Sequence, residues 1–361
     1  MSELPIRHSL VSQTVEILNA EISRGNWTEW LPSERSLCEK YQVSRNTLRA
    51  ALQRMKRDRV IRALHGSGNQ ILKHPDDKAR RSGIRDVALL TPEGLERLRP
   101  TQSVMIDELR ALLGEHGCQL RVFHGAQYFR PNPGRALKKL LAQRPHSCWI
   151  LLRSSAPVQK WFSENYGRCI VAGSVHDGLR LTHRDLDHRA VCRHAAGILL
   201  GLGHCRLALV VSKPPMAGDL ESEVGMLEAV RQSPNAEAEA VICQHDGTVA
   251  GIGQALRRLM AQRTPPTALL VANAYHYLAV SSHLAQQGLR VPEDVSVISR
   301  DEDLFLSYLV PSPARYVTNP RAFARLLQRS VLEILESGEA TQREIKLMPD
   351  FVRGGSISAR R

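Results

Sequence analysis

The sequence lacks the features that would anchor it in a membrane or build it around disulfides. No stretch of about 18 consecutive apolar residues occurs, so no transmembrane helix is predicted. The N-terminal residues contain no apolar run of the kind found in signal peptides, which favours a cytoplasmic protein. The seven cysteines are scattered and form no C-x-x-C pair, unlike those of a zinc site or a disulfide framework. We therefore expect reduced, mostly buried thiols and no bound metal.

The short motifs of several enzyme classes are also absent. The sequence contains no G-x-S-x-G, no H-E-x-x-H and no G-x-x-x-x-G-K-[ST]. Gly251 and Gly253 begin a dinucleotide-like glycine pattern, but its third glycine is missing. The histidines and cysteines within 192–194 and 204–205 could suggest metal ligands, yet a structural role is the simpler interpretation. The sequence thus predicts neither a cofactor nor an enzymatic activity.

Positive charge is concentrated near the N-terminus. The chain carries 49 Lys and Arg against 36 Asp and Glu, a net charge of +13. Residues 1–85 hold 16 of these cations against 9 of the acids, a net charge of +7. A basic excess of this kind favours an anionic partner, with nucleic acid a better candidate than a membrane surface.

The first 72 residues have the pattern of three helices followed by a hairpin. Apolar residues recur at 11, 15, 18 and 22 with the spacing of one helical face. Ser33 and Ser44 are predicted as the N-caps of the next two helices. Two short strand-like segments, 60–64 and 69–72, flank the turn sequence H-G-S-G. Together these elements predict a winged helix-turn-helix.

The third of these helices carries two rows of side chains with different chemistry. Leu48, Leu52 and Met55 are spaced as an apolar row, while Arg45 and Arg49 form a second row. Because successive residues of an α-helix are separated by about 100°, the two rows face different directions. We expect the apolar row to pack into the domain core and the arginine row to reach outward.

Beyond residue 86 the pattern changes to short apolar strands that alternate with helices. Predicted strands are 87–91, 120–124, 148–152, 168–173, 206–211, 240–243, 268–273 and 295–299. Predicted helices are 103–116, 133–144, 157–166, 188–202, 220–232, 249–262 and 275–288. This alternation is typical of an α/β fold with doubly wound parallel sheets. Eight such units are too many for one compact sheet, so we expect two, with ligands binding outside the carboxyl ends of the strands.

The N-terminal segment resembles the GntR family of bacterial transcription regulators. The resemblance rests on L-P-S-E-R (31–35), V-S-R-N-T-L-R (43–49) and the wing sequence H-G-S-G (65–68). Carried over residue by residue, it implies contacts to operator DNA from Arg35, Ser44, Arg45, Thr47, Arg49 and Gly66. Arginine suits bidentate contact with guanine or phosphate, which agrees with that implication.

The remainder resembles the effector-binding core of the LacI family, which is related to periplasmic sugar-binding proteins. The segments that carry this resemblance are G-L-G-H-C-R-L-A-L-V (201–210), A-L-L-V-A-N (268–273) and Q-G-L-R-V-P-E-D-V-S-V-I (287–298). A GntR-type head on such a core is the architecture of arabinose-type repressors. The expected organisation is a winged helix-turn-helix (1–73), a linker (74–85) and a core (86–361) with one subdomain of about 86–185 plus 319–340 and another of about 186–318 plus 344–356.

The LacI resemblance also implies an effector site. The asparagine and aspartate that bind sugar hydroxyls in that family correspond to Asn273 and Asp301. Three other family positions differ, since Ala274, Leu220 and Thr248 replace an acid, an arginine and an aromatic residue. These differences argue against an ordinary hexose as the effector. Replacement candidates at predicted strand ends are Tyr275, Arg300, Asp246 and Thr91, with His276, Arg153 and His124 as further ones.

These observations predict a ligand-responsive transcription regulator, most simply a repressor. It would bind a palindromic operator in double-stranded DNA as a homodimer, and a small molecule, best a carbohydrate, would modulate it. Two alternatives stay open at this stage. One is a sensory protein whose basic head contacts another protein, and the other is an enzyme with a DNA-binding head.

Overall fold

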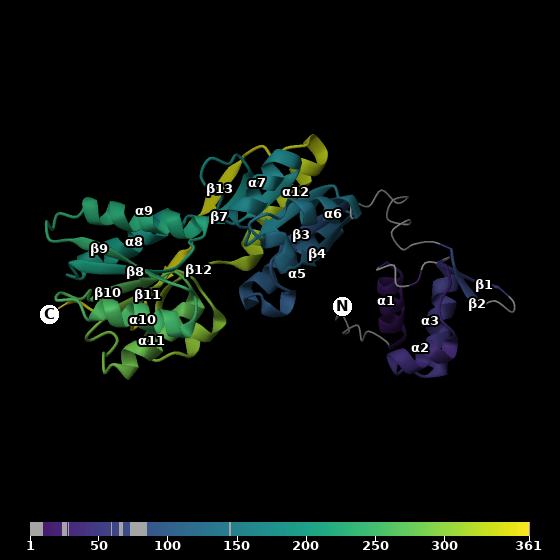
Figure 1. The fold of residues 1–361 in the computed structure, drawn as a ribbon, viewed down its shortest axis with the longest axis horizontal. Coiled ribbons are helices and arrows are strands. Elements are labelled where there is room, and N and C mark those ends of the chain that lie inside the picture. Colours follow the sequence, from purple (N-terminus) through teal and green to yellow (C-terminus); the bar gives the residue numbers. More distant parts are fainter. Residues whose placement is uncertain are drawn as a thin grey trace, which may run out of the picture. The chain divides into compact units, whose positions relative to one another are not determined.

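The computed structural model describes residues 10–23, 27, 29–58, 60–64, 68–72, 85–143 and 146–360. The chain divides into two compact units, Met1–Arg85 and Asp86–Arg361. Figure 1 labels the helices and strands of each unit. No helix in the described part of the chain has the length and apolar character needed to cross a membrane.

The N-terminal unit contains the predicted three helices and hairpin. Its elements are α1 (Leu10–Ser23), α2 (Glu34–Tyr41), α3 (Arg45–Arg57), β1 (Ile61–Leu64) and β2 (Gly68–Ile71). The two strands pair antiparallel, with Ile61 opposite Ile71. Both predicted N-caps are confirmed, because the hydroxyl of Ser33 accepts from the amide of Ser36 and that of Ser44 accepts from the amide of Thr47. The predicted turn at the wing tip, residues 65–67, lies outside the described residues.

The second unit is built on two six-stranded sheets, as predicted. The first sheet has the order β13-β7-β6-β5-β3-β4, and the second has the order β14-β12-β11-β10-β8-β9. The strands of the first sheet are β3 (Arg85–Thr91), β4 (Cys118–His124), β5 (Cys148–Leu152), β6 (Cys169–Ala172), β7 (Thr182–Leu186) and β13 (Glu344–Leu347). Those of the second are β8 (Arg206–Ser212), β9 (Glu239–His245), β10 (Ala268–Val271), β11 (Ser296–Ser299), β12 (Ala314–Val317) and β14 (Asp350–Val352).

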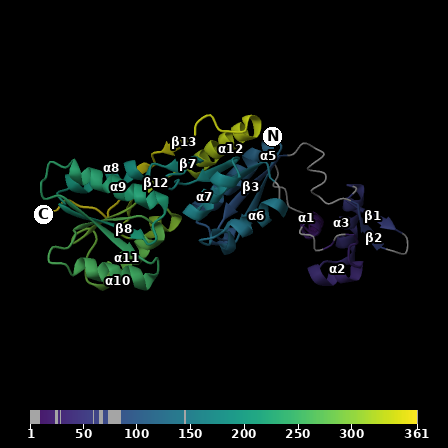
Figure 2. The same ribbon diagram turned by 45° about the horizontal axis from the view of Figure 1, so that its top comes forward.

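Helices cover both faces of each sheet. We call the first sheet with its helices the first lobe, and the second sheet with its helices the second lobe. In the first lobe, α5 (Pro100–Glu115) and α12 (Pro320–Ser337) pack on one face of the sheet, and α6 (Gly134–Gln143) and α7 (Ala156–Asn165) pack on the other. In the second lobe, α8 (His188–Gly201) and α9 (Ala217–Arg231) lie opposite α10 (Val249–Met260) and α11 (Ala274–Gln286) (Figures 1 and 2). Three short helices complete the unit: η1 (Leu95–Arg97), η2 (Ala126–Phe129) and η3 (Leu304–Tyr308).

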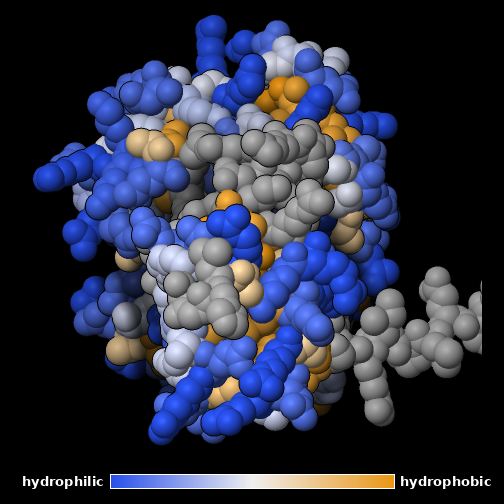
Figure 3. All heavy atoms as spheres, turned by 90° about the vertical axis from the view of Figure 1, so that its right-hand side faces the viewer, coloured by the Kyte–Doolittle hydropathy of each residue, from blue (hydrophilic) through white to orange (hydrophobic). Residues whose placement is uncertain are grey.

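Among the strand pairs of the two sheets whose register is described, all but one are parallel. The second-lobe pairs β9–β8, β8–β10, β10–β11 and β11–β12 are parallel, whereas β12 and β14 pair antiparallel. All seven cysteines are free and five of them are buried, as expected. Hydrophilic residues dominate the face of the molecule drawn in Figure 3, with hydrophobic residues in small, separate patches.

The predicted assignment of residues 344–356 to the second subdomain is wrong at its start. Strand β13 pairs in parallel with β7 and so completes the first sheet. Only the following strand, β14, joins the second sheet by pairing with β12. The chain therefore passes between the lobes once more after β13, because the two strands find partners in different sheets.

Candidate functional site

Helix α3 presents its arginine row as the sequence predicts. Leu48, Leu52 and Met55 are fully buried in the core of the N-terminal unit. Arg45 and Arg49 are exposed, four residues apart on the same side of the helix. A helix that is anchored by one face and carries two exposed guanidinium groups on another can enter the major groove of DNA.

Two of the predicted DNA-contacting arginines hold surface ion pairs. The Nε of Arg49 lies 3.0 Å from the Oε2 of Glu34, and the Nε of Arg35 lies 3.0 Å from the Oε1 of Glu39. The side chains of Arg35 and Arg49 are 82% and 67% exposed, so these pairs are easily exchanged for phosphate or base edges at a cost of about 0–1 kcal/mol each. Sequence reasoning missed both acidic partners, although the four-residue spacing of Arg35 and Glu39 was a visible signal.

Arg45 and the start of α3 are free of such pairs. Arg45 has no ion-pair partner among the described residues. The Ser44 hydroxyl lies 3.1 Å from the amide nitrogen of Thr47 and 2.9 Å from its Oγ1, which fixes both hydroxyls at the helix N-terminus. This end of the helix carries partial positive charge that suits a phosphate. Gly66, the predicted wing contact, lies outside the described residues.

The predicted effector residue Asp301 joins the two lobes. It follows strand β11 of the second lobe, and its Oδ2 accepts from the Nη1 of Arg99 at 2.7 Å. Arg99 belongs to the first lobe, where it is the N-cap residue of α5. The other carboxylate oxygen of Asp301 accepts from Nε of Arg300 at 3.1 Å. Burial alone would raise the pKa of Asp301, but the guanidinium groups of Arg300 and Arg99 hold it well below its usual value.

Arg300, another predicted effector residue, is turned into the second lobe. Its side chain is only 8% exposed, and its Nη1 donates to Asp219 and to Ser222, each at 2.8 Å. Both partners belong to the first two turns of α9. Burial alone would lower the pKa of Arg300, yet Asp301 and Asp219 raise it above its usual value. Arg300 therefore fixes α9 against β11 and holds Asp301 in place.

Asn273 and Tyr275 lie together at the start of α11. The side-chain oxygen of Asn273 accepts from the amide of Tyr275 at 2.9 Å and so caps the helix. The ring of Tyr275 is half exposed and lies 5.1 Å from that of Phe305. Burial and the nearby Asp303 carboxylate raise the pKa of Tyr275, which keeps its hydroxyl protonated. A capped amide beside an exposed aromatic ring can bind a polar ring such as a sugar.

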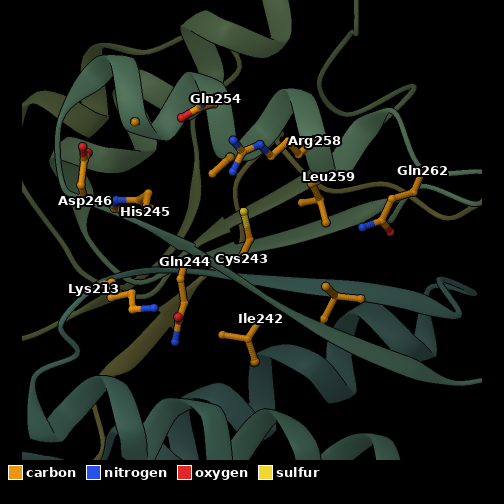
Figure 4. Close-up of a pocket in the computed structure, with 13 residues that line it drawn as sticks. Lys213, Ile242, Cys243, Gln244, His245, Asp246, Gln254, Arg258, Leu259 and Gln262 are labelled. Atoms are coloured by element: carbon orange, nitrogen blue, oxygen red, sulfur yellow. The ribbon is translucent and has the colours of Figure 1, made fainter.

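Asp246 lines a different space from the other predicted effector residues. Its Oδ1 accepts from the hydroxyl and amide of Thr248, the N-cap residue of α10, and these hydrogen bonds lower the pKa of Asp246. Asp246 borders a cavity of about 400 Å³ between β9 and α10, together with His245, Gln254 and Arg258 (Figure 4). None of the other predicted effector residues lines this cavity. Thr91 ends strand β3 and is fully buried, and its Oγ1 has no hydrogen-bond partner in the described part of the chain.

Sequence reasoning missed Arg99 as a member of this site. It also left His276 among the minor candidates, although its ring lies 4.6 Å from that of His245. Burial, His245 and Arg99 lower the pKa of His276 to about 4, so this imidazole is neutral at physiological pH. The described residues include no cluster of His, Cys, Asp and Glu able to hold a metal ion.

Comparisons with known proteins confirm both resemblances. The family described as "Bacterial regulatory proteins, gntR family" matches residues 10–71. The family described as "Periplasmic binding protein-like domain" matches residues 196–357. The chain is 24% identical over 166 residues to the HTH-type transcriptional regulator AglR of Rhizobium meliloti. This aligned region covers 45% of this chain and 46% of AglR. The chain spans about half the length of the curated relatives it matches.

Solved structures of similar proteins confirm the fold. A LacI transcriptional regulator from Bacillus cereus subsp. cytotoxis superimposes with a TM-score of 0.68 at 20% identity, over 77% of this chain and all of that one. The transcriptional regulator CelR in complex with cellobiose superimposes with a TM-score of 0.65 at 20% identity. That match covers 97% of this chain and 100% of CelR.

Proposed function

We propose that this chain, a GntR-type head joined to a periplasmic-binding-protein-like core, is a ligand-responsive transcription regulator, and specifically a repressor. The observation that carries the proposal is the combination in one chain of an anchored helix with two outward arginines and a two-lobed core. Its curated relatives are transcription regulators, which supports the proposal. We infer that the chain has no enzymatic activity. We also infer that it acts in the cytoplasm, because that is where a regulator would meet bacterial DNA.

In the head, each residue has a defined part in the proposed contact with DNA. Arg45 and Arg49 read base edges in the major groove, where arginine forms two parallel hydrogen bonds to guanine. Arg35 binds the backbone from α2, and Ser44 and Thr47 position phosphate at the start of α3. Gly66 at the wing tip would let the backbone approach the minor groove.

In the core, the effector would bind where the two lobes meet, near Asn273 and Asp301. A ligand shifts a conformational equilibrium only by its difference in affinity for the two states. A carbohydrate that contacts both lobes would favour their closed arrangement and so alter the spacing of the DNA-binding heads. Coupling of about 1–3 kcal/mol changes operator affinity about 5–150-fold, which suffices for a switch.

A homodimer is supported by an apolar surface on the second lobe. Helices α10, α11 and η3 share one buried cluster, which contains Ile252, Tyr277 and Leu306. Large apolar residues of these helices and of the segment that follows η3 are exposed: Val249, Leu278, Leu304, Tyr308 and Val310. Tyr308 and Val310 are 85% and 98% exposed. Large apolar side chains with this much exposure favour a protein interface, and a two-fold dimer would match a palindromic operator.

The dimer predicts a specific effect of charge at this surface. Tyr308→Asp should convert the protein from dimer to monomer in sedimentation, because a buried, unpaired carboxylate opposes association. Met348→Asp, at an equally apolar residue that is exposed elsewhere, should leave the dimer intact. A Tyr308→Asp protein that sediments as a dimer would contradict the proposed interface.

A gel shift with the DNA upstream of the chain's own gene tests the function as a whole. We expect a discrete complex whose affinity falls steeply between 50 and 200 mM salt, by roughly a thousandfold or more if six or more phosphates are contacted. Competitor DNA of unrelated sequence should not displace it. Absence of a complex, or an affinity indifferent to salt, would instead support a sensory protein whose basic head contacts protein.

A further inference from the structure

The aspartate assigned to sugar hydroxyls has both its oxygens bound to arginines. Asp301 accepts from Arg99 at 2.7 Å and from Arg300 at 3.1 Å, and its side chain is only 12% exposed. A carboxylate held in this way has less capacity left for neutral hydroxyl groups. The site therefore differs from a simple carboxylate-and-amide sugar site, in keeping with the substitutions at Leu220, Ala274 and Thr248.

The two arginines are not equivalent. Arg300 is buried, and its Nε and Nη1 already donate to Asp301, Asp219 and Ser222. Arg99 is 26% exposed, and among the described residues only its Nη1 has a side-chain partner, Asp301. A guanidinium group has five N–H donors in a planar fork, so Arg99 retains an unused edge that fits a carboxylate or phosphate.

The position of Arg99 strengthens its preference for an anion. As the residue just before α5, it lies at the positive end of a 16-residue helix. Its positive charge acts on residues of the second lobe, because it lowers the pKa of His276 and opposes the rise in the pKa of Tyr275. Its acidic partner among the described residues, Asp301, is shared with Arg300, which also pairs with Asp219.

The same surroundings provide an acceptor for hydroxyl groups. Asp303 is 99% buried, and its Oδ2 has no hydrogen-bond partner among the described residues. Its carboxylate lies within hydrogen-bonding reach of Tyr275 and raises that residue's pKa, yet a carboxylate has room for further donors. A buried carboxylate oxygen without a donor is costly unless a ligand supplies one. Asp303 and the Asn273 side-chain NH2 group, which has no partner among the described residues, would therefore bind the hydroxyls of a ligand whose acidic group is bound by Arg99.

We infer that the effector is a carbohydrate bearing an anionic group, a carboxylate or a phosphate, and that Arg99 is the residue that binds this group. The inference rests on the proposed function, because it names the ligand class of the same site. It assigns Arg300 a positioning role and gives Arg99, together with Asp303, the task of distinguishing acidic from neutral sugars.

Thermal shift of the full-length protein with matched ligands tests this inference. The probes are glucose, glucuronate and glucose 6-phosphate, with ribose, ribonate, ribose 5-phosphate and inorganic phosphate alongside. We expect one of the sugar acids or sugar phosphates to raise the Tm by roughly 5 °C at a hundredfold excess over its Kd. The neutral sugars and inorganic phosphate should not. Comparison of the acid with the phosphate identifies which anion Arg99 binds.

Two variants separate ligand binding from folding. Arg99→Gln keeps a polar side chain but removes the charge and the outer guanidinium edge, and should weaken binding of the active probe about 30-fold or more. Arg97→Gln removes an exposed arginine two residues away and should leave binding unchanged. Stabilisation by neutral sugars in wild type and Arg99→Gln alike, equal stabilisation by inorganic phosphate, or no stabilisation by any acidic probe would each overturn the inference. Operator binding measured in the same samples reports separately on the proposed function.

Discussion

Arg300→Met should lower the free energy of unfolding of the core by about 3–5 kcal/mol. The substitution preserves much of the side-chain volume but removes the charge that compensates two largely buried carboxylates, those of Asp219 and Asp301. Removing one partner of a buried ionic group costs far more than the pair itself contributes, because uncompensated charge is left in a medium of low dielectric constant. Urea unfolding followed by far-UV circular dichroism would measure the loss.

A surface pair provides the matched control for this substitution. Arg290 forms an ion pair with Asp294 at 2.9 Å, but its side chain is 70% exposed. Arg290→Met should therefore cost less than about 1 kcal/mol. If the two variants lost similar stability, the network around Arg300 would not be the buried, mutually dependent cluster that its hydrogen bonds describe.

The stability difference should also depend on pH. Because the pKa of Asp301 is lowered on folding, its contribution to stability is fully present above its unfolded pKa of about 4. That contribution is lost as the pH falls through the folded value. In the Arg300→Met variant, the Asp301 carboxylate of the folded protein is no longer stabilised by the charge of Arg300, so it takes up its proton at higher pH. The difference in free energy of unfolding between wild type and Arg300→Met should consequently become smaller as the pH is lowered from 7 to 3.

The elements of the fold were predictable wherever the pattern of apolar residues is local. Leu48, Leu52 and Met55 repeat with helical spacing and are buried together. Strand β7, in contrast, reads T-H-R-D-L and was not predicted, since it carries charge into the interior. Its Arg184 is 99% buried because the hydroxyl of Ser330 and backbone carbonyls near residue 343 accept its hydrogen bonds. Those partners are about 150 residues away and leave no local signal.

The candidate effector residues could be named from the sequence, but their contacts could not. The LacI resemblance selected Asn273 and Asp301, and the rule that ligands lie beyond strand ends added Asp246 as a replacement candidate. Only the folded chain shows that Asp301 meets Arg99, 202 residues distant, while Asp246 borders a separate cavity. In the head, the ion pair between Glu34 and Arg49 crosses from one helix to the next. Such pairings depend on how helices and lobes pack, which residue spacing does not encode.

The two arginines proposed to bind DNA give the second large expected effect. Arg45→Ala and Arg49→Ala should each weaken operator binding by about 1–3 kcal/mol, or roughly 5–150-fold, and relax base preference at the position each one reads. Both side chains are exposed and outside the apolar row of α3, so the head should keep its stability. Titrations of each variant against operators with single base changes would show which base pair each arginine recognises.

Substitution of Glu34 provides a control that should strengthen operator binding rather than weaken it. Its carboxylate holds the Nε of Arg49 at 3.0 Å, and that pair must open before Arg49 can bind DNA. Glu34→Gln removes the competing charge and should strengthen binding modestly, by no more than about 1 kcal/mol. Combined with Arg49→Ala, Glu34→Gln should lose most of its effect, because it acts through that arginine. Unchanged binding in both arginine variants would instead remove α3 from the major groove and place the basic surface of the head against another partner.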